Sequence, residues 1–62
     1  MSQQFSDEWL SVEEVAQILK MDEETVRRWI RNRQLKAYRF GRDLRIRRED
    51  FDEFVKERAL DK

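Results

Sequence analysis

The sequence predicts a mainly α-helical domain with a small β-hairpin, in the order helix, helix, hairpin, helix. Hydrophobic residues recur at helical spacing in three segments, and they alternate with polar residues in a segment between the second and the third. The length is the third observation, because a chain of 62 residues forms one small domain that buries only about 60% of its unfolded surface. Such a chain can form one layer of helices over a hairpin. Its core supplies a net free energy of unfolding of about 3–5 kcal/mol.

The first helix is predicted from about residue 12 to residue 19. Ser11 and Glu14 have the spacing of a capping box, in which each side chain hydrogen-bonds to the backbone amide of the other residue. Trp9, just before this box, is a candidate for one half of a hydrophobic staple. Apolar residues then fall at i, i+3, i+4 and i+7 on one helix face, namely Val12, Val15, Ala16 and Leu19, and Ile18 widens that face.

The second helix follows a short turn at residues 20–22. Asp22 is a good N-cap, and Glu23 and Glu24 are placed favourably at the positive end of the helix dipole. The apolar face of this helix carries Val26, Trp29 and Ile30. Two short helices joined by about three residues form a helix-turn-helix unit.

The hydrophobic period changes from 3.6 to 2 after residue 35, which predicts a hairpin that pairs about residues 36–40 with about residues 44–47. Gly41 and Arg42 between the strands suit a type II′ turn, which needs a positive φ at its first central residue. We expect arginines on the outer face of the hairpin. The inner face is expected to carry aromatic and aliphatic side chains, namely Tyr38, Phe40, Leu44 and Ile46.

The last helix is predicted over about residues 48–60, and it completes a winged helix-turn-helix. Its contacts to the core are expected from Phe51, Phe54 and Val55. The predicted domain spans residues 9–60, after a flexible N-terminal tail of residues 1–8. Most aromatic side chains are expected in the core, namely Trp29, Tyr38, Phe40, Phe51 and Phe54, whereas a reader of single-stranded nucleic acid would expose such rings for stacking.

The formal net charge is zero, but the charges are segregated along the chain. Residues 1–26 have a net charge of −6, residues 27–48 have +9, and residues 49–62 have −3. The middle segment contains ten Lys and Arg residues and a single acid, Asp43. Local charge matters more than net charge for binding a polyanion, so this distribution predicts one strongly cationic surface that binds nucleic acid.

Several classes of function are excluded by what the sequence lacks. Cysteine and histidine are absent, which excludes disulfides, thiol nucleophiles and the usual zinc sites. Adjacent carboxylates such as Glu13 and Glu14 lie at helix starts or on solvent faces, with no predicted apolar pocket to raise a pKa. A chain this short also has no room for a substrate cavity, which typically occupies about 300–1,000 Å³. We therefore expect no enzymatic activity, no metal or other cofactor and no small-molecule substrate.

The longest uninterrupted apolar run has two residues, which predicts neither a transmembrane helix nor a signal peptide. No association with a membrane is expected. The absence of cysteine also fits a reducing compartment. The expected location is the cytoplasm, in association with the nucleoid.

The outward side of the second helix carries the candidate contacts to bases. A helix fits the major groove of B-DNA, and its first two turns usually reach the base edges. Arg28 is the candidate for a bidentate contact to guanine, Thr25 for a thymine methyl group or a phosphate, and Glu24 for a cytosine amine. Arg27 and Arg31 flank these residues and are expected to contact phosphates. The alternative is that these arginines only solubilise the helix and pair with the acidic segments.

The hairpin supplies the second set of candidate contacts. Arg39, Arg45 and Arg47 are expected on one face of the hairpin, with Arg42 at its tip. A two-stranded ribbon with arginine at its end can lie along the DNA backbone or enter a narrow minor groove. Such contacts mostly position a protein and do not specify sequence. The alternative is that the arginines only protect an exposed sheet edge, for which one or two would suffice.

The sequence resembles the excisionase-like helix-turn-helix proteins of the MerR-like winged-helix superfamily. The motifs that carry the resemblance lie in order at residues 10–16, 21–22, 25–30, 35–42 and 45–51, and together they cover about residues 9–58. The resemblance implies that the second helix enters the major groove and that the wing reaches the adjacent minor groove or the backbone. The residues implied for these roles are Thr25, Arg27, Arg28 and Arg31 in the helix and Arg39, Arg42 and Arg45 in the wing.

One residue departs from the family pattern. Arg33 stands just after the second helix, where the family usually has glycine. A left-handed conformation there would cost Arg33 about 1 kcal/mol. Asn32 is the other residue that can adopt this conformation.

The expected activity is sequence-selective binding of double-stranded DNA. The resemblance implies either a recombination directionality factor, which bends DNA and directs an integrase towards excision, or a small transcriptional regulator. The implied partners are duplex DNA together with an integrase or recombinase, or further copies of the chain that associate cooperatively on DNA. A hypothesis from another class is a protein-interaction adaptor whose basic hairpin docks on an acidic partner.

Overall fold

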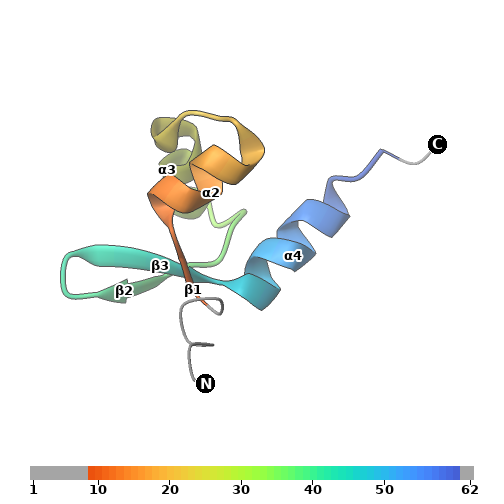
Figure 1. Ribbon diagram of the computed structural model, residues 1–62. Helices are drawn as coiled ribbons and strands as arrows, with labels where there is room; N and C mark the ends of the chain where they lie inside the picture. Colours follow the sequence, from red (N-terminus) through yellow and green to blue (C-terminus); the bar gives the residue numbers. More distant parts are fainter. Residues whose placement is uncertain (1–8, 61–62) are drawn as a thin grey trace, which may run out of the picture.

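The computed structural model describes residues 9–60, and within that range it has three helices and a three-stranded antiparallel sheet (Figure 1). In chain order the elements are β1 (Trp9–Ser11), α2 (Val12–Leu19), α3 (Glu23–Arg31), β2 (Tyr38–Phe40), β3 (Asp43–Arg47) and α4 (Arg48–Glu57). Figure 1 shows α2 and α3 on one side of the sheet, with α4 continuing from the end of β3. The predicted winged helix-turn-helix class is confirmed. The predicted tail, residues 1–8, lies outside the described residues.

Helix α2 begins and ends at the predicted residues. The backbone amide of Ser11 donates to Glu14 Oε1 at 2.9 Å, and the amide of Glu14 donates to Ser11 Oγ at 3.0 Å, so the predicted capping box is formed. At the other end, Lys20 takes a left-handed conformation with φ of 57°. This turn lets the amide of Met21 donate to the carbonyl of Ala16 at 2.8 Å, and it directs the chain into α3.

Helix α3 follows Asp22 as predicted, although the Asp22 side chain makes no capping hydrogen bond. Its C-terminal end is closed by Arg33, whose φ is 64°, whereas Asn32 has a φ of −87°. The amide of Gln34 donates to the carbonyl of Trp29 at 2.8 Å, which satisfies a carbonyl of the last turn. Arg33 is therefore the residue in the left-handed position, at a cost of about 1 kcal/mol relative to glycine.

The sheet contains a strand that the sequence did not predict. β3 is the central strand, with β1 and β2 as its neighbours. Trp9, considered above for a hydrophobic staple, lies in β1 opposite Arg47. Leu10 lies opposite Ile46, and both side chains are buried. Trp9 and Leu10 are adjacent apolar residues, so this segment lacks the alternation that predicts a strand, and its partner β3 is distant in the sequence.

The β2–β3 hairpin closes through a two-residue turn of Gly41 and Arg42, with Phe40 opposite Asp43. Gly41 has a φ of 68°, and Arg42 is not among the residues with positive φ. This combination is that of the predicted type II′ turn. A Cβ atom on Gly41 would meet no atom within 4 Å, so the turn requires glycine for its backbone conformation and not for space.

The register of the hairpin overturns the prediction that Tyr38 and Phe40 point into the core. Residues directly opposite each other in antiparallel strands share one face of the sheet. Leu44 packs against the core, whereas Tyr38 lies opposite Arg45 on the other face. Phe40 shares that outer face and is 54% exposed. The cause is the turn: a two-residue loop places Phe40 opposite Asp43, which separates the aromatic residues from the aliphatic ones.

The same register corrects the prediction that three arginines of the hairpin share one face. Arg39 lies opposite Leu44 and is on the core side of the sheet. Arg45 lies opposite Ser11 and Tyr38, and Arg47 lies opposite Trp9, so these two arginines are on the outer side. The wing therefore has two faces of different chemistry.

The core lies between the sheet and the helices, and its buried residues are Leu10, Val12, Val15, Ala16, Val26, Leu35, Ile46, Phe51 and Phe54. Trp29 is only partly buried against it. The prediction that Ile18 and Val55 contribute to the core is wrong, since their side chains are 52% and 41% exposed. Helix α4 also ends at Glu57, earlier than the predicted residue 60, and Leu60 is 98% exposed, so its burial does not support a further turn. No helix in the described range is both long and apolar enough to cross a bilayer.

Candidate nucleic-acid interface

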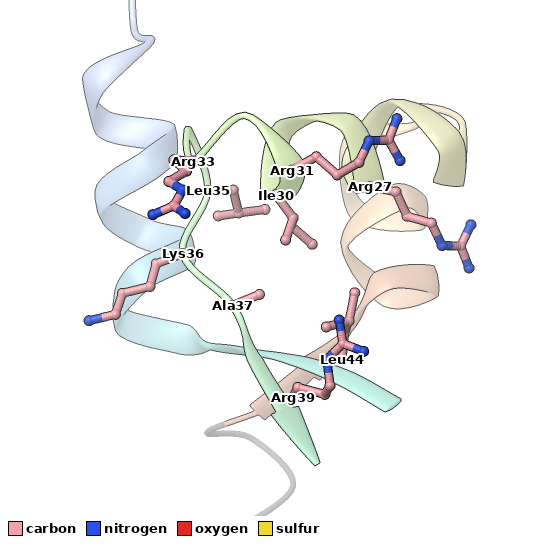
Figure 2. A pocket seen from close by; sticks show the side chains of 9 residues that line it. All are labelled: Arg27, Ile30, Arg31, Arg33, Leu35, Lys36, Ala37, Arg39 and Leu44. Atoms are coloured by element: carbon pink, nitrogen blue, oxygen red, sulfur yellow. The ribbon is translucent and has the colours of Figure 1, made fainter. Parts of the chain in front are cut away.

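A cleft of about 630 Å³ separates α3 from the wing and opens to solvent (Figure 2). We call it the basic groove, and its lining residues are Arg27, Ile30, Arg31, Arg33, Leu35, Lys36, Ala37, Arg39 and Leu44. Figure 2 shows Ile30, Leu35 and Ala37 in the middle of this set, with the long cationic side chains around them. The groove thus combines an apolar floor with a rim of five cations.

Each side of the groove is fixed by a buried anchor next to it. In α3, Val26 is fully buried, which leaves Arg27 and Arg31 exposed, one helical turn apart. In the connection between α3 and β2, the side chain of Leu35 is 1% exposed. This anchor ties the connection to the core, so that Arg33 and Lys36, on either side of it, remain exposed.

The groove arginines of α3 pair with acids on the same helix. Arg27 Nη2 lies 3.6 Å from Glu23 Oε1, and Arg31 Nη2 donates to Glu24 Oε2 at 3.2 Å. All four side chains are about half exposed or more. Exposed ion pairs are worth about 0–1 kcal/mol, so an incoming anion replaces them at little cost. The ion pairs orient Arg27 and Arg31, but both guanidinium groups remain exposed and accessible to an anion.

The other three cations of the groove are not paired in this way. Within the described residues, no carboxylate lies within 4.0 Å of the charged groups of Arg33, Lys36 or Arg39. The Lys36 Nζ atom lies 5.5 Å from the centroid of the Tyr38 ring, in a cation–π contact. This half of the groove therefore carries uncompensated positive charge.

A second, smaller depression of about 280 Å³ lies beside the hairpin tip. Its lining includes Arg27, Arg42 and Arg45 together with the N-terminal end of α2. Arg27 lines both depressions, so the positive charge continues from the basic groove to the tip of the wing. The charge at the tip is partly offset, because Arg45 Nη2 lies 3.9 Å from Asp43 Oδ2.

The structure brings together five of the nine residues selected from the sequence. These five line the two depressions, and they are Arg27, Arg31, Arg39, Arg42 and Arg45. The other four line neither one. Glu24 and Arg28 are exposed on α3, Thr25 is half-buried beside them, and Arg47 donates to Glu49 Oε2 at 3.1 Å on the outer side of the sheet.

The selection from the sequence missed two residues of the groove, Arg33 and Lys36. Both belong to the basic middle segment, and that charge count was the only signal for them. They lie in the connection between α3 and β2, which has no hydrophobic period from which the direction of a side chain follows. Their place in the groove depends on the burial of Leu35 between them.

The volume of the groove corrects the expectation that a chain this short has no room for a space the size of a ligand site. A space of about 630 Å³ lies within the usual range for ligand sites, so the prediction that this chain has no room for such a volume is wrong. The space is an open cleft, however, and its polar lining consists of cations alone. No cluster of potential metal ligands is present among the described residues. The arrangement is chemically suited to holding an extended polyanion against an apolar floor.

A family model described as a helix-turn-helix domain matches residues 9–59. The matched residues run from the start of β1 to beyond the end of α4, and they include every residue that lines the basic groove. No curated protein and no solved structure matches the chain.

Proposed function

The chain belongs to the helix-turn-helix domain family, an excisionase-like family of DNA-binding domains that are typically non-enzymatic, and on that premise we propose that it binds duplex DNA sequence-selectively. In this proposal α3 enters the major groove, and the β2–β3 wing lies on the adjacent minor groove or the backbone. The observation that carries the proposal is the basic groove between these two elements.

The shape of duplex DNA gives the groove its role. A helix of about 10–12 Å diameter fits a major groove about 12 Å wide. One sugar-phosphate strand separates the major groove from the neighbouring minor groove, so it must pass between α3 and the wing. The five cations of the basic groove are suited to its phosphates. The apolar floor of Ile30, Leu35 and Ala37 is suited to the deoxyribose rings, which carry no 2′-hydroxyl.

The remaining exposed residues of α3 are assigned to the bases. Arg28 has no carboxylate within 4.0 Å among the described residues, so its guanidinium is free for a bidentate contact to guanine. We assign Thr25 to a thymine methyl group or a phosphate, and Glu24 to a cytosine amine once Arg31 has turned to a phosphate. In the wing, Arg42 and Arg45 contact the backbone or the minor groove. Arg47 lies further from the groove and makes a peripheral phosphate contact.

The biological role within this activity is proposed from the resemblance. The chain acts as a recombination directionality factor or as a small transcriptional regulator, in the manner of the MerR-like winged-helix proteins that it resembles. An integrase or recombinase, or further copies of the chain on adjacent sites, would be its protein partners. Selection of bound duplexes from a random pool, followed by titration of one, two and three copies of the selected site, identifies the target and measures cooperativity.

Salt dependence separates duplex binding from the adaptor hypothesis. If the five cations of the basic groove each contact a phosphate, these contacts alone are expected to give a slope of log K against log[salt] of about −4 to −5, and the wing contacts make it steeper. The measurement is fluorescence anisotropy of a labelled duplex at several salt concentrations. A slope near zero contradicts the proposal, because an adaptor that docks on an acidic protein does not release the counterions of DNA.

Base contacts and backbone contacts differ in their sequence dependence, which allows a second test. Arg28→Ala is expected to remove about 1–3 kcal/mol of discrimination at the base pair that it reads, because a bidentate pair is lost. Arg42→Ala is expected to weaken all duplexes alike. Both variants are measured on the selected site and on single-base substitutions of it. If both variants lower every affinity by the same factor, Arg28 has no role in base recognition.

A further inference from the structure

The outer face of the sheet carries aromatic side chains that the fold does not need for its core. Trp9 in β1 and Tyr38 and Phe40 in β2 share this face, on the opposite side of the sheet from Leu10, Leu44 and Ile46. Trp9 and Tyr38 are half-buried, and Phe40 is more than half exposed. We call these three residues the aromatic patch.

The rings of the aromatic patch contact one another across the width of the sheet. The centroid of Trp9 lies 5.4 Å from that of Tyr38 and 5.4 Å from that of Phe40. The interplanar angles are 88° and 87°, so both contacts are edge-to-face. Such contacts fix the orientation of the rings. The exposed part of the patch is therefore a preorganised π surface.

Cations surround this π surface. Arg45 and Arg47 of the central strand lie on the same face, opposite Tyr38 and Trp9 respectively, with side chains 40% and 41% exposed. Lys36 lies over the Tyr38 ring. Arg45 is near Asp43 and Arg47 is near Glu49, but these surface pairs are weak enough for a phosphate to replace the carboxylates.

We propose that the aromatic patch is a second nucleic-acid site, which binds one or two unpaired bases of a single strand. Exposed aromatic rings on a sheet, next to cations that contact the backbone, are the two components by which proteins hold single strands. The faces of bases in a duplex are stacked on each other and cannot reach the rings, so the patch favours unpaired bases. An acidic protein segment would use the cations, but it would gain nothing specific from the π surface.

The rings of the site lie on the other side of the wing from the floor of the basic groove, and Lys36 contributes to both sites. Arg39 and Leu44, which line the groove, are on the other face of the same strands. The rings of the aromatic patch therefore lie on the face of the wing opposite Arg39, although the single strand shares Lys36, Arg45 and Arg47 with the proposed duplex contacts. The proposal does not rest on the duplex-binding function, because it can be tested with a single strand alone.

The test uses the full chain and fluorescein-labelled decathymidylate, with anisotropy as the readout. An abasic deoxyribose-phosphate oligomer of equal length is the matched ligand, since it has the same charge and no bases. We expect decathymidylate to bind at least about tenfold tighter than the abasic oligomer. We expect Phe40→Leu, which keeps an apolar side chain but removes the ring, to weaken decathymidylate binding about tenfold, and Phe40→Trp to preserve it.

Three further measurements make the outcome decisive. Thermal unfolding of Phe40→Leu and Phe40→Trp checks that both variants are folded, as the exposure of Phe40 predicts. Arg39→Ala is the control for the groove, and it is expected to leave decathymidylate binding nearly unchanged. Decaglutamate, an acidic peptide of similar charge, is expected to bind no better than the abasic oligomer.

The proposal is overturned by any of three results. Equal affinity for decathymidylate and the abasic oligomer means that bases are not stacked. If Arg39→Ala weakens decathymidylate binding and Phe40→Leu does not, the single strand lies in the basic groove. Tighter binding of decaglutamate means that the patch serves an acidic protein. None of these results bears on duplex binding, whose failure would appear separately in the salt titration.

Discussion

Ile46→Ala is expected to leave a large fraction of the chain unfolded in water at room temperature. Ile46 is fully buried in the central strand, opposite Leu10 and among the core residues from all three helices. Truncation of a buried isoleucine to alanine costs about 2–5 kcal/mol. A domain of this size has a net stability of about 3–5 kcal/mol, so the loss is comparable with the whole. Urea unfolding followed by circular dichroism measures the change.

Ile18→Ala is the matched control for this experiment. It makes the same chemical change on α2, but Ile18 is 52% exposed, and alanine is the better helix former. We expect its unfolding midpoint to stay within the range of a surface substitution, about 0.5 kcal/mol. Similar midpoints for the two variants would mean that the core is not organised around β3.

Removing the three unpaired cations of the basic groove is expected to weaken duplex binding about 100-fold. The variant carries Arg33→Gln, Lys36→Gln and Arg39→Gln, and it leaves no newly unpaired carboxylate, because these residues have no acidic partner within 4.0 Å in the described part of the chain. Each contact is worth about 1 kcal/mol at the surface, which gives the estimate. The salt slope is expected to fall by nearly 3, since each phosphate contributes about 0.9.

The control removes the same amount of charge from elsewhere. Lys20→Gln, Arg48→Gln and Lys56→Gln lower the net charge equally, and none of these residues lines the groove. Arg48→Gln also removes an exposed ion pair with Asp52, which is worth about 0–1 kcal/mol of stability. We expect a loss of less than tenfold from this control. If both triple variants lose affinity equally, the binding reflects net charge, and the groove has no special role.

Local sequence signals predicted the secondary structure well. The capping box of Ser11 and Glu14 fixed the start of α2, and the apolar period predicted its end at Leu19. Gly41 predicted the turn of the wing, because a positive φ at that position favours glycine over every other residue. These features are formed by residues within a few positions of each other, so a single sequence contains the information that they require.

Three features were not predicted by these local signals. β1 forms because Leu10 and Ile46 are buried against each other, and neither residue predicts that pairing alone. α4 stops at Glu57, where Arg58 turns back to lie over the ring of Phe54 and Leu60 stays exposed. Arg33 and Lys36 reach the basic groove because the burial of Leu35 directs the connection that carries them.

The sequence by itself determined that this is a small helix-turn-helix domain with a basic wing, because helical periods, caps, turns and charge segregation are properties of neighbouring residues. Only the tertiary structure decided which side chains of the wing face α3. That choice follows from the pairing of β2 with β3, in which a shift of one residue exchanges the two faces of a strand. The register placed Arg39 in the groove and turned Tyr38 and Phe40 outward to join Trp9.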